Sequence, residues 1–207
     1  MTVAEAFSHI YANRVWSKGS TEEFNSGDGS GIEFTAQYWA FLKNFIRNKS
    51  IGTVVDLGCG DFRVGRMIAD AGLGYIGADV VPELIAYNTR HFGTDQVSFR
   101  CLDITRETVP DGDLCLIRQV FQHLSNSEII AALGQCGRFR YVLVSEHLPI
   151  LGPVKPNLDK PHGPDIRLYR NSGVFLDAPP FSQHVQTVLE VPVDSRSVIR
   201  TVLIEKS

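Results

Sequence analysis

The stretch TVVDLGCGDFRVG, residues 53–65, decides the fold. It opens with β-branched residues and reaches an acid, Asp56, which predicts a short strand. Gly58 and Gly60 predict a tight turn, because glycine takes backbone angles that a Cβ would block. A second acid, Asp79, ends the next apolar run. In a parallel sheet, this strand end is where a carboxylate can meet a ribose.

From residue 52 onward the sequence alternates between strand and helix patterns. The expected strands are 53–57, 75–79, 97–101, 113–118 and 140–146, with helices at 63–72, 82–91 and 126–136. Continuous apolar strands between helices are typical of a parallel sheet covered on both faces. Two last strands, 184–191 and 197–205, lie close enough to form a hairpin. We expect an α/β fold: a Rossmann-like, mostly parallel, seven-stranded sheet with helices on both faces and a C-terminal antiparallel hairpin.

The length of 207 residues suits one domain. Its expected parts are an N-terminal region (1–50), a ligand-binding core (51–147), a loop (148–182) and the hairpin (183–207). The first part combines helices at 2–13 and 33–48 with a glycine-rich loop at 14–31. This loop is either a flexible surface segment or a cover that folds over a ligand, with Trp16 at its root.

Residues 148–182 hold seven of the ten prolines. Proline excludes a helix over most of this length. The end of the stretch is rich in aromatic and aliphatic residues, so a disordered linker is not expected either. We interpret it as an ordered lid or substrate loop.

Composition excludes several classes of protein. A net charge of −3 argues against a general nucleic-acid binder, whose affinity depends on Lys and Arg. No apolar run approaches the roughly 20 residues of a membrane span, and no signal peptide is recognisable. The four cysteines form no C-x-x-C pair, and three lie in or beside apolar runs. We expect a cytoplasmic protein with neither a membrane partner nor a bound metal.

Three acidic motifs follow one another along the chain. Asp56-x-Gly58-x-Gly60 follows the first strand, Asp79 closes the second, and Asp103 comes after the third. Together with residues 113–124 around the fourth strand, this ordered set resembles the class I S-adenosylmethionine-dependent methyltransferases over residues 53–147. Phe62 departs from the pattern, because many members have a third glycine there. Residues 26–30 and 165–181 also look like a subgroup often associated with glycan biosynthesis.

The resemblance implies S-adenosylmethionine as cofactor and assigns it a set of contacts. Glycines pass close to its amino-acid end, one acid orients that end, a second binds the ribose, and a third meets the adenine amino group. The residues so assigned are Asp56, Gly58, Cys59, Gly60, Asp79, Val80, Asp103, Ile104, Arg118 and Gln119. Trp16 joins them as part of the possible covering loop. For Asp103, a simple strand-end cap is the alternative.

Methyl transfer is an in-line displacement in which an enzyme mostly supplies alignment. A hydroxyl acceptor would benefit from a base, and histidine is the usual choice. His123 lies just past the fourth strand, at the edge where ligands bind in open α/β sheets; a purely structural role is the alternative. Glu146 and His147 are further catalytic candidates. Candidates for binding a polar or anionic substrate are His162, Asp165, Arg167 and Tyr169, whose alternative is ordinary loop solvation.

We predict a methyltransferase that acts on a small polar molecule or sugar, with O-methylation as the expected reaction. A protein methyltransferase is the nearest alternative. An NAD-dependent oxidoreductase would use the same turn and Asp79, but Arg63 stands where its third glycine belongs. A non-catalytic cofactor-binding module is the alternative outside enzymes. Nucleic acid is not expected as substrate, because the run after the fourth strand lacks an Asn-Pro-Pro-Tyr type sequence.

Overall fold

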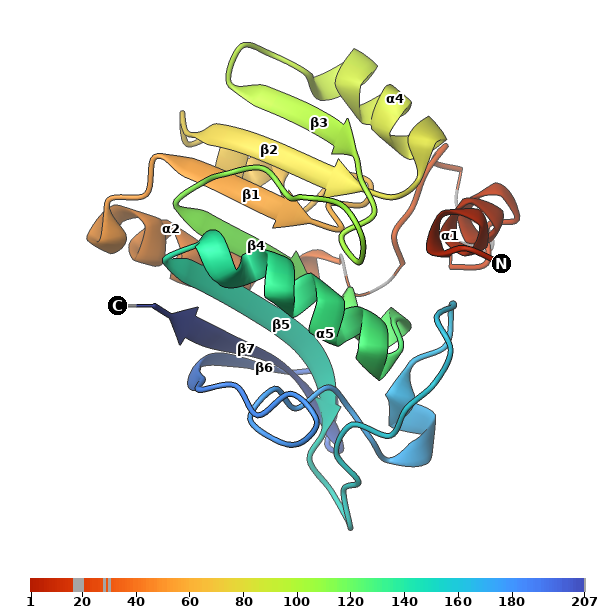
Figure 1. Cartoon of the computed structure of the whole chain (residues 1–207). Coiled ribbons are helices and arrows are strands. Elements are labelled where there is room, and N and C mark those ends of the chain that lie inside the picture. The colour runs from red at the N-terminus through yellow and green to blue at the C-terminus, as the bar shows by residue number, and fades with distance from the viewer. Residues whose placement is uncertain (17–20, 28, 30, 207) are drawn as a thin grey trace.

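A computed structural model describes residues 1–16, 21–27, 29 and 31–206 of the chain (Figure 1). Positions 17–20, 28 and 30 of the glycine-rich loop lie outside this description. Seven strands form one sheet in the order β3-β2-β1-β4-β5-β7-β6. They are β1 (Thr53–Leu57), β2 (Gly74–Asp79), β3 (Val97–Cys101), β4 (Leu114–Arg118), β5 (Tyr141–Pro149), β6 (Gln186–Pro192) and β7 (Ser197–Glu205). Strands β1 to β5 are parallel, and β7 runs antiparallel to both β5 and β6. The predicted fold class is confirmed.

Helices cover both faces of this sheet (Figure 1). They are α1 (Val3–Ala12), α2 (Ile32–Lys49), α3 (Arg66–Ala69), α4 (Pro82–Phe92) and α5 (Asn126–Gln135), with short 3₁₀ turns η2 (Phe121–His123), η3 (Cys136–Arg138) and η4 (Arg167–Arg170). Successive strand residues point to opposite faces. Val55 therefore packs in one core with Ile129 of α5, while Val54 packs in a second core with Leu42 of α2. The sheet is buried on both sides, as its apolar strands predict.

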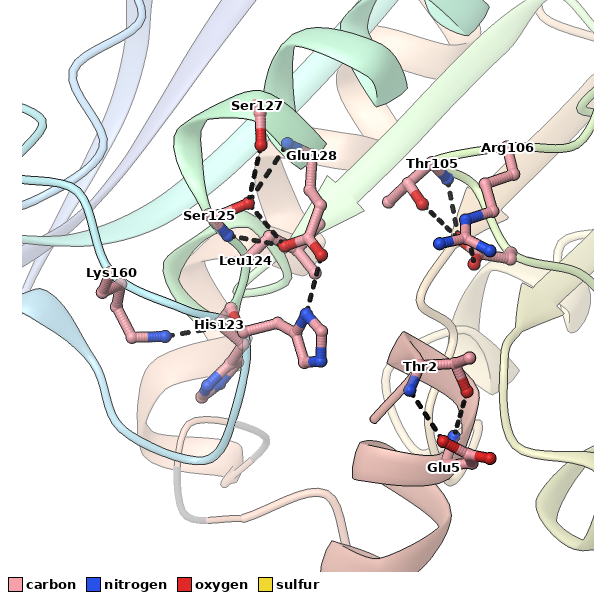
Figure 2. A network of polar contacts seen from close by, with 12 residues as sticks. Thr2, Glu5, Thr105, Arg106, His123, Leu124, Ser125, Ser127, Glu128 and Lys160 are labelled. Atoms are coloured by element: carbon pink, nitrogen blue, oxygen red, sulfur yellow. Dashed lines mark hydrogen bonds and ion pairs between the residues drawn. The ribbon is translucent and has the colours of Figure 1, made fainter.

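Capping boxes begin two of the helices. The Thr2 hydroxyl accepts from the Glu5 N–H while the Glu5 carboxylate accepts from the Thr2 N–H, and Ser125 and Glu128 repeat the arrangement before α5 (Figure 2). Each box satisfies donors that a helix N-terminus leaves without intrahelical partners. Figure 1 shows α1 beyond the carboxyl ends of β1–β3, so this cap fixes where a helix starts over the sheet edge.

The expected helix at 63–72 is reduced to the single turn α3. Phe62 takes a left-handed conformation, with φ of 62°. Its ring is 3% exposed and packs against Tyr75, Phe92 and Phe99. Burial of an aromatic ring offsets the strain of this backbone angle, which a non-glycine residue rarely adopts. The glycine turn therefore runs on through residue 65 before any helix can form.

The proline-rich segment 148–182 has no crossover helix among its residues; its one regular element is η4. Asn157 organises it: the side-chain amide donates to the carbonyls of Phe175 and Pro179 and accepts from the Phe175 N–H at 2.8 Å. Val174 and Leu176 join the core on the α5 face. The segment is thus attached to the domain by buried contacts. Strand β5 also continues to Pro149, beyond the expected residue 146, because β7 pairs with it throughout.

All four cysteines are free thiols. Cys59, Cys115 and Cys136 are buried, whereas Cys101 at the end of β3 is exposed. In the described part of the chain, no helix is both long enough and apolar enough to cross a membrane.

Candidate active site

A cavity lies at the carboxyl edge of the sheet, bounded by the ends of β1, β2 and β4 and by residues of α1. All eleven residues predicted to contact the cofactor line it. They are Trp16, Asp56, Gly58, Cys59, Gly60, Asp79, Val80, Asp103, Ile104, Arg118 and Gln119. Carboxyl ends of parallel strands meet at one edge, which is why segments distant in sequence converge here.

The glycine turn forms the floor between the two acids. Gly58 and Gly60 have φ of 78° and 55°, and a Cβ would collide with Val120 at the first and with Ser26 at the second. Gly58 and Cys59 donate their N–H groups to the Ala78 carbonyl, at 2.7 and 3.0 Å. Gly60 donates to Asp79. The turn therefore lets a ligand come close, but its N–H groups already have acceptors within the protein.

Asp56 is buried at the end of β1. Its carboxylate accepts a 2.7 Å hydrogen bond from the Tyr75 hydroxyl, a residue of β2. Burial raises the pKa of Asp56 to about 6, against the opposing effects of this hydrogen bond and of the Arg118 charge. A buried acid with this pKa is readily ionised near neutrality and favours a cationic neighbour.

Asp79 ends β2 and is partly buried. Its two oxygens accept from the N–H groups of Gly60 at 3.1 Å and Val81 at 3.2 Å. Burial raises its pKa to about 6 in spite of these bonds. Each carboxylate oxygen keeps further acceptor capacity, so the group can bind ligand hydroxyls without leaving the turn.

Asp103 lies in the cavity wall and also caps its own turn. Its carboxylate accepts from the Thr105 N–H at 2.9 Å and the Thr105 hydroxyl at 2.6 Å, and Arg106 lies 3.9 Å away (Figure 2). Val80 and Ile104 add apolar surface beside it. This end of the cavity can take a flat apolar group with a polar edge.

The opposite end is built from the last residues of β4 and from the glycine-rich loop. Arg118 donates to the Gly29 carbonyl at 2.8 Å, and its guanidinium carbon lies 5.4 Å from the centre of the Tyr38 ring. Gln119 has a left-handed φ of 57°. In the described structure, Arg118 Nε, Gln119 Nε2 and Gln122 Oε1 are buried without hydrogen-bond partners. Such unpaired polar atoms in a cavity wall are suited to a polar ligand.

His123 lines the cavity from η2. Its Nδ1 lies 3.2 Å from the Gly163 carbonyl, which requires a proton on Nδ1 and leaves Nε2 as the acceptor, 3.3 Å from the Gln122 amide nitrogen. The ring packs against Trp16 at an interplanar angle of 45°, with centroids 4.9 Å apart. Burial, followed by the Lys160 charge, lowers the pKa of His123 to about 4. The imidazole is therefore neutral at pH 7.

Glu146 and His147, the other catalytic candidates, lie outside the cavity lining. The Glu146 carboxylate is buried and accepts from the N–H groups of Phe121 and Gln122 at 2.9 and 3.0 Å. Burial raises its pKa to about 8. The His147 Nε2 lies 2.9 Å from the Ser197 hydroxyl on β7. Both side chains are used within the sheet and its connections.

The four candidates for substrate binding also lie outside the cavity lining. His162 Nδ1 is 2.7 Å from the Glu128 carboxylate in the first turn of α5. Arg167 is 2% exposed and donates to backbone carbonyls. Asp165 is exposed, and Tyr169 points into solvent with 85% exposure. The structure does not bring these four side chains together around the cavity.

Several lining residues have no counterpart among the sequence-based site residues: Val3, Phe7, Tyr11, Ser26, Asp61 and Gln122. Ser26 links three of them, since its hydroxyl lies 2.8 Å from the Tyr11 hydroxyl and accepts from the Asp61 N–H. The apolar face of the first helix carries Val3, Phe7 and Tyr11, and their use as a cavity wall was not apparent from the pattern. Among the described residues, no group of three His, Cys, Asp or Glu side chains could hold a metal ion.

Comparison with known proteins adds a family match. Residues 54–140 match the family model of a methyltransferase domain. This range runs from β1 to the residue before β5 and includes both acids and the glycine turn. A search of curated proteins gives no significant sequence match.

Solved structures with the same fold share little sequence with this chain. Human N-acetylserotonin methyltransferase in complex with SAM is 14% identical with a TM-score of 0.61; the match covers 100% of this chain and 60% of that one. Magnesium protoporphyrin IX methyltransferase from Synechocystis PCC 6803 with bound SAH is 15% identical with a TM-score of 0.60, covering 98% and 99%. The N-methyltransferase NodS from Bradyrhizobium japonicum is 11% identical, with a TM-score of 0.56 and coverage of 86% and 100%. This chain spans about 60% of the length of the human protein.

Proposed function

We propose that this chain, whose residues 54–140 match a methyltransferase domain, is a class I S-adenosylmethionine-dependent methyltransferase that methylates a hydroxyl group of a small polar molecule or sugar. The cofactor is S-adenosylmethionine, and the eleven lining residues named above are proposed to hold it. The cytoplasm, expected from composition, is the proposed location. The neighbours named above act on different substrates, so the acceptor must be argued from this cavity.

The residues present fit this cofactor. Asp56 and Asp79 face one cavity from either side of the turn Gly58-Cys59-Gly60. Burial raises both pKa values to about 6, and a cationic ligand stabilises the ionised forms. The unpaired donors of Arg118 and Gln119 are available to a carboxylate at the same end. A zwitterionic amino acid joined to a nucleoside supplies all of these partners.

A dinucleotide fits less well. Its pyrophosphate needs free backbone N–H groups at the start of a helix. Here Gly58, Cys59 and Gly60 donate to acceptors of the protein, and α3 is a single turn. This arrangement, with two acids facing the same space, favours the methyltransferase over the NAD-dependent oxidoreductase.

Bound S-adenosylmethionine supplies a methyl group on a positively charged sulfur, whose departure as a neutral thioether needs no general acid. The protein then has to orient the acceptor and exclude water. His123 lines the cavity with Nε2 unprotonated, and an acceptor hydroxyl that replaced the Gln122 amide beside Nε2 could give its proton to this nitrogen. Burial lowers the pKa of His123 to about 4, which weakens it as a base, so its contribution would depend on its placement rather than on its basicity.

The observation that carries the proposal is the pair of carboxylates facing one cavity across the glycine turn. Titration calorimetry with S-adenosylhomocysteine and, separately, with NADH tests it. We expect binding of the first and none of the second. Failure of the wild type to bind S-adenosylhomocysteine, or tighter binding of NADH, would sink the proposal.

The alternatives differ in the acceptor. Incubation with methyl-labelled cofactor and extract fractions separates them: label in the small-molecule fraction supports the proposal, and label in protein supports a protein methyltransferase. Cofactor binding without transfer to any fraction supports a non-catalytic module. His123→Ala should lower turnover while leaving cofactor affinity within about threefold, because its ring is proposed to serve the acceptor.

A further inference from the structure

Residues 121–124, the His123 segment, are held on their N–H side by a single carboxylate. Phe121 and Gln122 donate their N–H groups to the two oxygens of Glu146, at 2.9 and 3.0 Å. Glu146 comes from β5, the neighbouring strand, and is 3% exposed. Each oxygen of the carboxylate thus fixes one peptide group of the segment.

The carbonyl side of the same segment is held by one guanidinium. Arg167 donates from Nη1 to the carbonyls of Phe121 and Gln122, both at 3.2 Å, and from Nη2 to the Leu124 carbonyl at 2.8 Å. Its Nε donates to the Leu158 carbonyl and Nη2 to the Asn126 side chain. All five N–H donors of this arginine therefore have acceptors within the protein.

The remaining carbonyl, that of His123, accepts from the Gly163 N–H at 3.0 Å and from Lys160 Nζ at 3.3 Å (Figure 2). The neighbouring carbonyls of Gly163 and Pro164 accept from His123 Nδ1 and Trp16 Nε1. Residues 158–167 thus set both the backbone and the two ring orientations on this side of the cavity.

Burying these polar groups has a cost in folding free energy. Burying a carboxyl group and a guanidinium together costs several kcal/mol of desolvation for each group that is ionised, and apolar side chains of similar size would often serve stability as well. The bonds go to the segment that carries Gln122 and His123, two residues of the cavity wall. These two buried side chains place that part of the cavity wall through their hydrogen bonds.

We propose that Glu146 and Arg167 are positioning residues. They fix Gln122 and His123 in the part of the cavity wall that would face the methyl acceptor. This rests on the proposed methyl transfer, in which His123 serves the acceptor. Residues 158–167 then hold the His123 segment in place, and their charged side chains do not contact the substrate. The charged side chain that acts on the His123 ring is Lys160, and Asp165 contributes a backbone hydrogen bond.

The experiment follows the His123 ring by NMR in histidine-labelled protein, with its signal assigned through His123→Gln. In Arg167→Lys and Glu146→Gln the segment loses fixed partners, so the pKa of His123 should move by about one unit toward its ordinary value. Affinity for S-adenosylhomocysteine should stay within about threefold of the wild type, since neither Glu146 nor Arg167 lines the cavity. Matched controls are Arg138→Lys and Glu190→Gln, which alter exposed ion pairs.

Hydrogen exchange of the wild type gives a second test that needs no variant to fold. The amides of Phe121 and Gln122 should exchange at least about 100-fold more slowly than amides of exposed loops. Rapid exchange of these two amides, or an unchanged His123 pKa in either folded variant, would overturn the proposal. Absence of S-adenosylhomocysteine binding by the wild type would instead refute the proposed function and leave the positioning pair standing.

Discussion

Two regions at the carboxyl edge of the sheet use the same residue type in opposite ways. At the ends of β1 and β2, Asp56 and Asp79 line the cavity. At the end of β5, Glu146 accepts two backbone N–H groups and lies outside the lining. Burial raises the pKa of all three acids. Desolvation alone therefore does not distinguish a ligand-binding carboxylate from a structural one.

The difference comes from the segments that follow β1 and β4. After β1, the glycine turn bonds to the Ala78 carbonyl, which leaves Asp56 beside an open space. After β4, the turn η2 directs two N–H groups toward the end of β5, where Glu146 accepts them. An acid at a strand end can bind a ligand where the N–H groups of the following backbone donate to other acceptors in the protein.

The largest expected effect is on cofactor affinity. Asp79→Ala should weaken S-adenosylhomocysteine binding by about 100-fold, because a charged hydrogen-bond acceptor to the ligand is lost. Calorimetry at pH 7.5 measures it, with Glu146→Gln as the comparison. Equal losses in both variants would erase the distinction between the two regions.

Glu146→Ala should lower the free energy of unfolding by about 2 kcal/mol, since two buried N–H groups lose their acceptor. Urea denaturation measures this, and Glu190→Ala is the control, with an expected change within about 0.5 kcal/mol for an exposed pair. A Glu146→Ala protein as stable as the wild type would contradict the structural role.

The two regions should also differ in their response to pH. Asp56 and Asp79 have pKa values of about 6, so affinity for S-adenosylhomocysteine should fall below pH 6, by about tenfold per unit if one ionised acid is required and about 100-fold if both are. Their folded pKa values exceed the ordinary one, so their contribution to the stability of the free protein decreases as pH rises from 4 to 6 and is constant above. Calorimetry and thermal unfolding between pH 4.5 and about 8 should therefore show opposite trends. If affinity and stability changed with pH in the same direction, groups other than Asp56 and Asp79 would control the pH dependence.

Tyr75→Phe should have a smaller effect. It removes the 2.7 Å hydrogen bond to Asp56, so the pKa of that acid rises further and affinity at pH 7 falls about fivefold. The same variant should move the midpoint of the affinity profile to higher pH. An unshifted midpoint would assign the titration to Asp79 alone.

The smallest effect is expected at Tyr169, which is 85% exposed. Tyr169→Ala should change neither S-adenosylhomocysteine affinity nor the free energy of unfolding by more than about 0.5 kcal/mol. A larger loss of affinity would show that η4 reaches the cavity in solution.

The fold and the first residues of the ligand site could be predicted from the sequence, because both depend on local sequence patterns. Glycines after a β-branched run and an acid at the next strand end predict that Asp56, Gly60 and Asp79 meet at one ligand site, and all three line the cavity. The single-turn α3 was not predicted, because the left-handed angle at Phe62 is stabilised by rings of Phe92 and Phe99, which are distant in sequence.

The roles of Glu146, Arg167 and the α1 side chains depend on contacts between segments that are distant in sequence, and no local pattern encodes such contacts. The sequence pattern puts Glu146 at a strand end just as it does Asp79, and the course of η2 separates their roles. Arg167 resembled a substrate ligand in a polar loop, yet its acceptors in residues 121–126 lie more than 40 residues away in the chain. Phe7 and Tyr11 form an ordinary apolar helix face, and their place in the cavity follows from where α1 lies over the sheet edge.

The exposure of Cys101 has a practical consequence. The other three thiols are buried, so a maleimide should alkylate this one selectively, next to Val80, whose carbonyl lies 3.8 Å from its sulfur. Burial and the Asp79 charge raise the pKa of the Cys101 thiol, which slows its alkylation. A ligand that neutralises Asp79 should speed the reaction unless it covers the sulfur, so the labelling rate becomes a direct report on occupancy at the end of β2.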